Sequence, residues 1–151
     1  MAKVTALTLD TAPTVDDLLY TVTDPGGTPA SRKVTIQSVQ NLLAITAKTA
    51  SATSALDDNA KLITMDVTTT ANSYTIQPNA TIAHPIGTCI LVQQIGTGVT
   101  SIIGGTGVTL QGAGASVSAG TTAISARYDT ATCIKTLTDT WVIQGAVGTI
   151  A

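Results

Sequence analysis

The 60 residues from 67 to 126 contain no Asp, Glu, Lys or Arg, which limits what this chain can fold into. An isolated soluble domain normally keeps charged side chains over its surface. Long strand edges without Lys or Glu invite pairing with other chains. We therefore expect subunit contacts to cover much of this region, most simply in a homotrimer. The alternative is a monomer whose surface consists of Thr, Ser, Asn and Gln hydroxyls and amides.

The composition favours β-structure over helix. Thr makes up about a fifth of the 151 residues, and both Glu and Phe are absent. Thr, Val and Ile favour pleated strands, because a branched Cβ packs well there and resists the helix. With 44% hydrophobic residues the chain is not of the disordered type. We therefore predict a mostly β protein in which Trp141, the only tryptophan, anchors the core; its alternative role is a ligand platform.

Short strand-like segments, separated by Gly, Pro and Asn, recur through the second part of the chain. The expected strands are 61–67, 73–77, 88–94, 99–103, 108–111, 116–118, 123–128, 133–137 and 141–144. Many short strands at even spacing suggest that residues 59–151 form a β-sandwich, a jelly-roll-like domain or an intertwined β-assembly. The preceding stretch 46–58 has few large side chains, which predicts a linker or a lightly packed extended segment.

The N-terminal residues 1–45 have a separate internal order. An apolar strand at 18–22 is followed by the turn Asp24-Pro25-Gly26-Gly27 and by a returning strand at 32–34. Thr35 can then cap a short helix over 36–43. So short a segment cannot fold alone, and we expect it to bind a partner surface. The expected contact residues are Leu18, Leu19, Val22, Ile36, Val39 and Leu42.

Both ends of the chain resemble one class of protein. The N-terminal resemblance is carried by Ala6-Leu7, Pro13, Asp16-Asp17-Leu18-Leu19-Tyr20, Asp24-Pro25-Gly26-Gly27, Lys33-Val34-Thr35-Ile36 and Leu42. This pattern resembles the N-terminal segment of small structural proteins of tailed bacteriophages, of the head-fibre, capsid-decoration and tail-fibre types. The closing run 139–146 is similar to the final strand of many such domains. The plain alternative for the N-terminal pattern is an ordinary surface hairpin followed by a short helix.

The resemblance implies a non-enzymatic virion protein made in the host cytoplasm. Its N-terminal segment would attach to the major capsid protein or another virion protein, and the remainder would project outward as a homotrimer. On this reading the chain decorates or cements the capsid, or forms a head fibre. The second reading is a tail-fibre or tail-tip component that binds a host surface glycan or protein.

The sequence argues against several other functions and locations. The net charge is −2 and there is no basic patch, which argues against nucleic-acid binding. No apolar span of 18 residues suggests a transmembrane helix, and no secretory signal is recognisable at the N-terminus. Because synthesis is then cytoplasmic, we expect Cys89 and Cys133 to be small buried residues rather than a disulfide. With His84 as the only histidine, we expect no zinc site.

The sequence also lacks recognisable catalytic motifs. There is no nucleophile elbow and no phosphate-binding loop. The acid pairs Asp16-Asp17 and Asp57-Asp58 lack further ligands at calcium-loop spacing. We therefore expect no enzymatic activity, no cofactor and no metal. An enzymatic alternative, a hydrolase or lyase of a surface polysaccharide, would need acids such as Asp66, Asp129 and Asp139 to meet in one cleft.

Overall fold

The computed structural model describes residues 18–23, 30–35 and 43–151 of the chain. The chain divides into two units, Met1–Leu42 and Leu43–Ala151. In the first unit, β1 (Leu18–Thr23) and β2 (Ala30–Thr35) form a two-stranded antiparallel sheet. These strands agree with the expected segments at 18–22 and 32–34. The helix expected over 36–43 falls on residues 36–42, which lie outside the described residues.

The regular secondary structure of the second unit is almost entirely strand, so the expectation of a mostly β protein is confirmed. A single 3₁₀ helix, η1, spans Leu56–Asp58. The strands of this unit are β3 (Ala44–Lys48), β4 (Ala52–Thr53), β5 (Lys61–Met65), β6 (Asn72–Ile76), β7 (Cys89–Gln94), β8 (Thr100–Gly104), β9 (Thr109–Gly112), β10 (Ala115–Ser118), β11 (Thr121–Ala123), β12 (Thr130–Leu137) and β13 (Thr140–Gly145).

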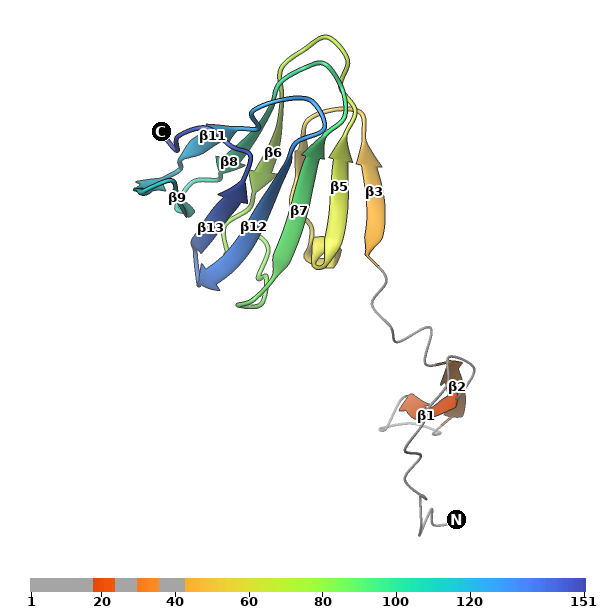
Figure 1. Cartoon of the computed structure of the whole chain (residues 1–151). Helices are drawn as coiled ribbons and strands as arrows, with labels where there is room; N and C mark the ends of the chain where they lie inside the picture. Colours follow the sequence, from red (N-terminus) through yellow and green to blue (C-terminus); the bar gives the residue numbers. More distant parts are fainter. Residues whose placement is uncertain (1–17, 24–29, 36–42) are drawn as a thin grey trace. The chain divides into compact units, whose positions relative to one another are not determined.

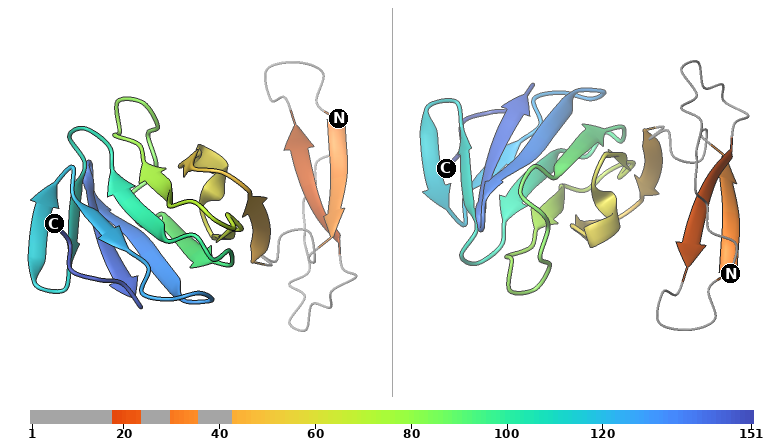
Figure 2. Two further views of the ribbon diagram at one scale, coloured as in Figure 1. Left: turned by 90° about the horizontal axis from the view of Figure 1, so that it is seen from above. Right: turned by 90° about the horizontal axis from the view of Figure 1, so that it is seen from below.

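These strands form two sheets, between which the chain alternates (Figures 1 and 2). The seven-stranded sheet has the order β10-β9-β13-β12-β7-β5-β3, and the four-stranded sheet has the order β11-β8-β6-β4. From β3 to β8 each strand of one sheet is followed by a strand of the other. Successive turns of the chain therefore stack in parallel, β3 on β5 on β7 and β4 on β6 on β8. A jelly roll has only antiparallel neighbours, so these parallel ladders exclude the jelly-roll-like alternative.

The two sheets enclose one hydrophobic core. Buried and half-buried positions alternate along β6, β7 and β8, as expected of strands that cover a core with one face. Trp141, only 1% exposed, is the largest buried side chain, which confirms its predicted role as a core anchor. The other core residues are Ile63, Met65, Tyr74, Ile76, Ile90, Val92, Ile102, Val108, Leu110, Ile124, Ala131, Cys133, Ile143 and Ile150.

The stretch 46–58, expected to be a linker or a lightly packed extended segment, is part of the second unit. The linker alternative is wrong, whereas most of the stretch is exposed or half-buried and part of it is extended in β3 and β4, in agreement with the second alternative. β3 pairs with β5, β4 pairs with β6, and the Asp58 side chain is buried. The linker expectation failed because it relied on the lack of large side chains. Strand pairing uses backbone groups, and the Ser54 N–H also donates to the Thr75 carbonyl at 2.8 Å. The β-unit therefore begins at Leu43 rather than at residue 59.

The strand expected at 123–128 is wrong beyond Ala123, where β11 ends. Ile124 makes one isolated bridge to Val147, and the chain then turns toward β12. Tyr128 has a φ of 73°, and its N–H donates to the Gln94 carbonyl at 2.7 Å. The physical reason is topological, because the chain crosses here from the four-stranded to the seven-stranded sheet and cannot stay extended.

The two cysteines are free, as expected, but the expectation that both are buried holds for Cys133 and not for Cys89. Cys133 on β12 pairs with Ile90 of β7, while Cys89 pairs with Ile134. Cys133 is buried, and Cys89 is half-buried. Adjacent positions in a ladder project to opposite faces of a sheet, so the two thiols lie on different sides.

Candidate functional site

Three of the six expected partner-binding residues lie in the two-stranded sheet of the first unit. Leu18, Leu19 and Val22 belong to β1 and pair with Thr35, Val34 and Ser31 of β2. The remaining three, Ile36, Val39 and Leu42, lie outside the described residues. A two-stranded sheet is marginally stable by itself in water. A contact with another surface would therefore supply stability that this hairpin lacks.

Polar side chains gather inside the second unit, at the end where β5 and β7 begin. The Tyr74 hydroxyl donates to Oδ2 of Asp58 at 2.6 Å, and the same oxygen accepts from the Ala55 N–H at 2.8 Å. Both Tyr74 and Asp58 are buried. Burial and the neighbouring carboxylate of Asp58 raise the pKa of Tyr74 well above its usual range. The hydroxyl therefore keeps its proton and acts as a donor.

Ser54 and His84 are the next pair in this interior cluster. Ser54 Oγ lies 3.2 Å from Nε2 of His84 and accepts from the Gln77 N–H at 3.0 Å. The His84 ring meets the Trp141 ring edge-on, with centroids 5.3 Å apart. Nδ1 of His84 is buried and has no hydrogen-bond partner among the described residues. Burial, followed by the charge of Lys135, lowers the pKa of His84, so the imidazole is neutral at pH 7.

Lys135 completes the cluster as a buried cation among neutral oxygens. Its Nζ donates to Oδ1 of Asn79 and to the His84 carbonyl, both at 2.7 Å. Asn79 is also held by its N–H, which donates to Oδ1 of Asp139 at 2.6 Å. The side chain of Lys135 thus links the segment 77–88, between β6 and β7, to the C-terminal part of β12. A buried charge needs such partners, because its desolvation is costly.

This cluster can fix loops, but its groups are not placed to react with a substrate. Ser54 and His84 are each 3% exposed, so neither the hydroxyl nor the imidazole meets solvent. A Ser–His–acid triad also needs a carboxylate on the second ring nitrogen, and no residue in the described ranges bonds to that nitrogen of His84. The geometry therefore favours a structural role for these residues.

The acid pair at 57–58 does not form a joint site. Asp57 is exposed and forms a salt bridge with Lys61 at 2.9 Å, which lowers the pKa of Asp57. Asp58 is buried against Tyr74. Among the described residues, no three His, Cys, Asp or Glu side chains lie close enough together to hold a metal ion. Asp129 and Asp139 flank opposite ends of β12, about 25 Å apart at the rise of a strand, so these two acids do not meet in one cleft.

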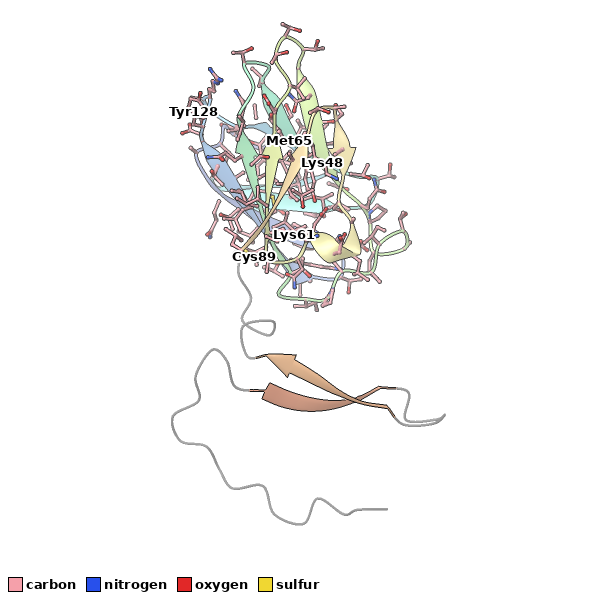
Figure 3. The ribbon with its side chains drawn as sticks, turned by 90° about the vertical axis from the view of Figure 1, so that its right-hand side faces the viewer. Lys48, Lys61, Met65, Cys89 and Tyr128 are labelled. Carbon is pink, nitrogen blue, oxygen red and sulfur yellow. The ribbon has the colours of Figure 1, made fainter. Side chains whose placement is uncertain are left out.

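Of the three aromatic residues available for glycan binding in the second unit, only one is exposed. Tyr74 and Trp141 are buried, whereas Tyr128 is 59% exposed. The Arg127 guanidinium carbon lies 4.6 Å from the centroid of the Tyr128 ring. Arg127 Nε also donates to the Ile95 carbonyl at 2.7 Å, which ties this turn to the end of β7. Figure 3 shows Tyr128 at the end of the unit opposite Cys89 and Lys61.

The interior cluster was missed at the level of sequence, although one signal was present. Ala131, Cys133 and Lys135 are alternate residues of β12, and all three are buried. The alternation that places the first two in the core therefore also places the lysine there. No comparable signal distinguishes Asp58 from its exposed neighbour Asp57.

Comparisons of the chain with models of protein families, with curated proteins and with solved structures give no match. Within the parts of the chain that the structure describes, no helix has the length and apolar character needed to span a bilayer. The functional argument therefore rests on the residues themselves.

Proposed function

We propose that this chain is a non-enzymatic structural protein of a tailed-phage virion, namely a trimeric capsid-decoration, cement or head-fibre protein. Its N-terminal segment docks on the head, and the β-unit projects from the head or clamps adjacent capsid subunits. The partners are further copies of the chain and the major capsid protein or another virion protein. The chain is synthesised in the host cytoplasm and functions in the virion.

The observation that carries this proposal is the division of the chain at Leu42. The β1–β2 hairpin is a small unit with two strands, whereas residues 43–151 form their own core. A hairpin gains stability by burying a face against a larger surface. Because β3 begins at Ala44 and belongs to the second unit, the proposal takes residues 1–42, rather than the expected 1–45, as the docking segment.

Three copies joined in one body would bind through avidity. Each hairpin contributes a weak footprint, and linking three footprints makes the second and third contacts effectively intramolecular. Such linkage raises the overall affinity by roughly 10²–10⁴ when the geometry allows simultaneous contact. Trimerisation of the β-unit and docking of the hairpin therefore cooperate in the proposed function.

Co-sedimentation with virions tests this proposal. The particles are those of the phage that encodes the chain, prepared without its gene. We expect the full chain to pellet saturably with these particles, and we expect a chain without residues 1–42 to remain in solution. A double substitution, Leu19→Lys with Val22→Lys, should weaken binding at least tenfold. Thr28→Lys, which adds a charge in the part of the sequence that joins β1 to β2, serves as the control. Unchanged binding of the shortened chain would contradict the proposal.

A second candidate function, a tail-fibre or tail-tip protein that binds a host glycan, is favoured by the Arg127–Tyr128 turn. Exposed aromatic rings and arginine are common in binding hot spots, and Tyr128 is held at a positive φ that a bulky residue rarely adopts. Binding of the full chain to host cell-wall extract, lost in Tyr128→Ala and retained in Tyr20→Ala, would support this role. Absence of binding in the unsubstituted chain would eliminate it.

A further inference from the structure

The outer face of the seven-stranded sheet carries large apolar side chains. Ile63, Ile90 and Cys133 are buried on the inner face, so their sequence neighbours in each strand project outward. The register aligns Ile45, Leu62 and Leu91 across β3, β5 and β7. It also aligns Cys89, Ile134 and Val142 across β7, β12 and β13. We call these two rows, which consist of Ile45, Leu62, Leu91, Cys89, Ile134 and Val142, the apolar face.

The apolar face is accessible to solvent and carries no charge. Ile45 is 67% exposed, and the other five residues are half-buried by their neighbours in the sheet. The first row continues across β12 and β13 with Thr132 and Gln144, and the second continues onto β9 with Gln111. A contiguous apolar surface with a neutral polar rim is characteristic of an interaction site. Figure 1 looks onto this sheet.

The outer face of the four-stranded sheet has a different character, although it is equally free of charge. Its register aligns Ser73, Ser101 and Ala123 in one row. A second row consists of Thr53, Thr75, Ile103 and Thr121. Ile103 is the single large aliphatic residue there, and the hydroxyls can bond to water. Only the seven-stranded sheet therefore exposes a surface that water solvates poorly.

A second copy of this chain fits the apolar face better than a charged partner does. Contact between two neutral faces desolvates no charge, whereas an acidic or basic partner would lose hydration without gaining an ion pair. At a spacing of about 4.8 Å, seven strands are about 34 Å wide, and strands of five or six residues are about 18 Å long. The whole sheet face is therefore about 600 Å², and the five strands that carry the apolar face account for about 430 Å² of it, compared with the ~800 Å² per partner of a standard specific interface.

The exposed edge of β3 adds to this surface. In the part of the chain that the structure describes, β3 pairs only with β5, so its second edge has unpaired backbone groups. Ile45 lies on this edge strand and belongs to the apolar face. Unprotected edges of this kind are templates for pairing with another chain. The edge and the face are therefore continuous parts of one contact surface.

We propose that copies of this chain associate through the apolar face and the adjoining β3 edge, turning the seven-stranded sheets toward a common axis. The copy number of three rests on the proposed function, but the choice of face does not. This contact gives the homotrimer a defined surface. It also leaves the Arg127–Tyr128 turn at the end of the strands, outside the two rows of the face.

Light scattering after size-exclusion chromatography tests the proposal. The full chain should elute as a species of about 46 kDa, three times the chain mass of 15.2 kDa. Leu91→Lys and Ile134→Lys each place a charge in the face and should reduce the mass to that of one copy. Ile103→Lys places the same charge on the outer face of the other sheet, and its mass should stay at three copies. Circular dichroism verifies that each variant remains folded.

A second measurement on the unsubstituted chain keeps the test decisive if a variant fails to fold. Cys89 belongs to the apolar face, whereas Cys133 is buried in the core. A thiol reagent followed by peptide mass mapping should modify Cys89 slowly in the concentrated protein. The rate should rise at least tenfold when dilution separates the copies. Modification of Cys133 should stay slow at both concentrations.

The outcomes separate this inference from the proposed function. A trimer that survives Leu91→Lys and Ile134→Lys, or a Cys89 that reacts equally fast at all concentrations, overturns the inference. A single-copy species of the unsubstituted chain at high concentration overturns it as well. If the mass behaves as expected but the chain ignores virions, the inference stands and the virion function fails. If the chain binds virions as a trimer that the face variants leave intact, the function stands and the inference fails.

Discussion

Removing the hydroxyl of Tyr74 should destabilise the β-unit through a single buried hydrogen bond. The Tyr74 hydroxyl donates to Oδ2 of Asp58 at 2.6 Å, and the tyrosine has no solvent exposure. In Tyr74→Phe the ring stays in place, but the buried carboxylate loses one of its two donors and retains only the Ala55 N–H. Hydrogen bonds to charged groups contribute about 1.5–3 kcal/mol. We therefore expect the free energy of unfolding to fall by about 2 kcal/mol.

Urea unfolding, followed by circular dichroism, measures this change. For a unit of this size, a loss of about 2 kcal/mol corresponds to a fall in Tm of roughly 8 °C. Tyr128→Phe removes a hydroxyl from an exposed tyrosine and should change the free energy by less than about 0.5 kcal/mol. In a double-mutant cycle with Asp58→Asn, the two substitutions should be non-additive because the residues touch. A Tyr74→Phe variant as stable as the unsubstituted chain would refute this reasoning.

Three further predictions concern other parts of the β-unit. Gly96→Ala should cost about 2 kcal/mol because a Cβ would overlap the Val67 backbone. Gly148→Ala should be nearly neutral in the same urea titration, because its Cβ would make only ordinary van der Waals contacts, the nearest with the Ala123 carbonyl oxygen at 3.9 Å. The pKa of His84 is lowered from 6.5 in the folded state, so as the pH falls the unfolded state binds the proton before the folded state does. The free energy of unfolding should therefore fall as the pH drops below about 6.5 toward the folded-state pKa. His84→Gln should flatten that part of the profile, and an unchanged slope would contradict the assignment. Burial raises the pKa of Cys133 to about 12, so this thiol should react with iodoacetamide only as fast as the protein unfolds.

The pattern of the sequence predicted the central strands well. Expected strands at 73–77 and 88–94 correspond to β6 and β7 within one residue at each end. Trp141 was identified as a core residue because the chain has no Phe and no second Trp. These predictions depend on local alternation and composition, which the chain carries in each segment.

The pairing of the strands could not be predicted in this way. Alternation indicates that a strand has a buried face, but it does not say which strand lies beside it or in which direction. Parallel stacking of β3, β5 and β7 therefore remained unforeseen, and with it the role of residues 46–58. The expected strand at 123–128 failed for a similar reason, because a change of sheet is not a local property.

One pattern in the sequence indicated the apolar face but was not used in the prediction. The run Cys89-Ile90-Leu91-Val92 is apolar at every position, which is typical of strands covered on both sides. The subunit contacts expected from the charge-free interval 67–126 include only some residues of the apolar face. Ile45, Leu62, Ile134 and Val142 lie outside that interval and join the face through strand pairing.

The measurement that tests the proposed virion function most directly is a density map of the intact virion of the phage that, on this proposal, encodes the chain. The account predicts threefold density on the head that fits three copies of residues 43–151, with the seven-stranded sheets facing the axis and the N-terminal segments touching the shell. Particles that lack the chain, or that carry it as isolated single copies, would contradict the account.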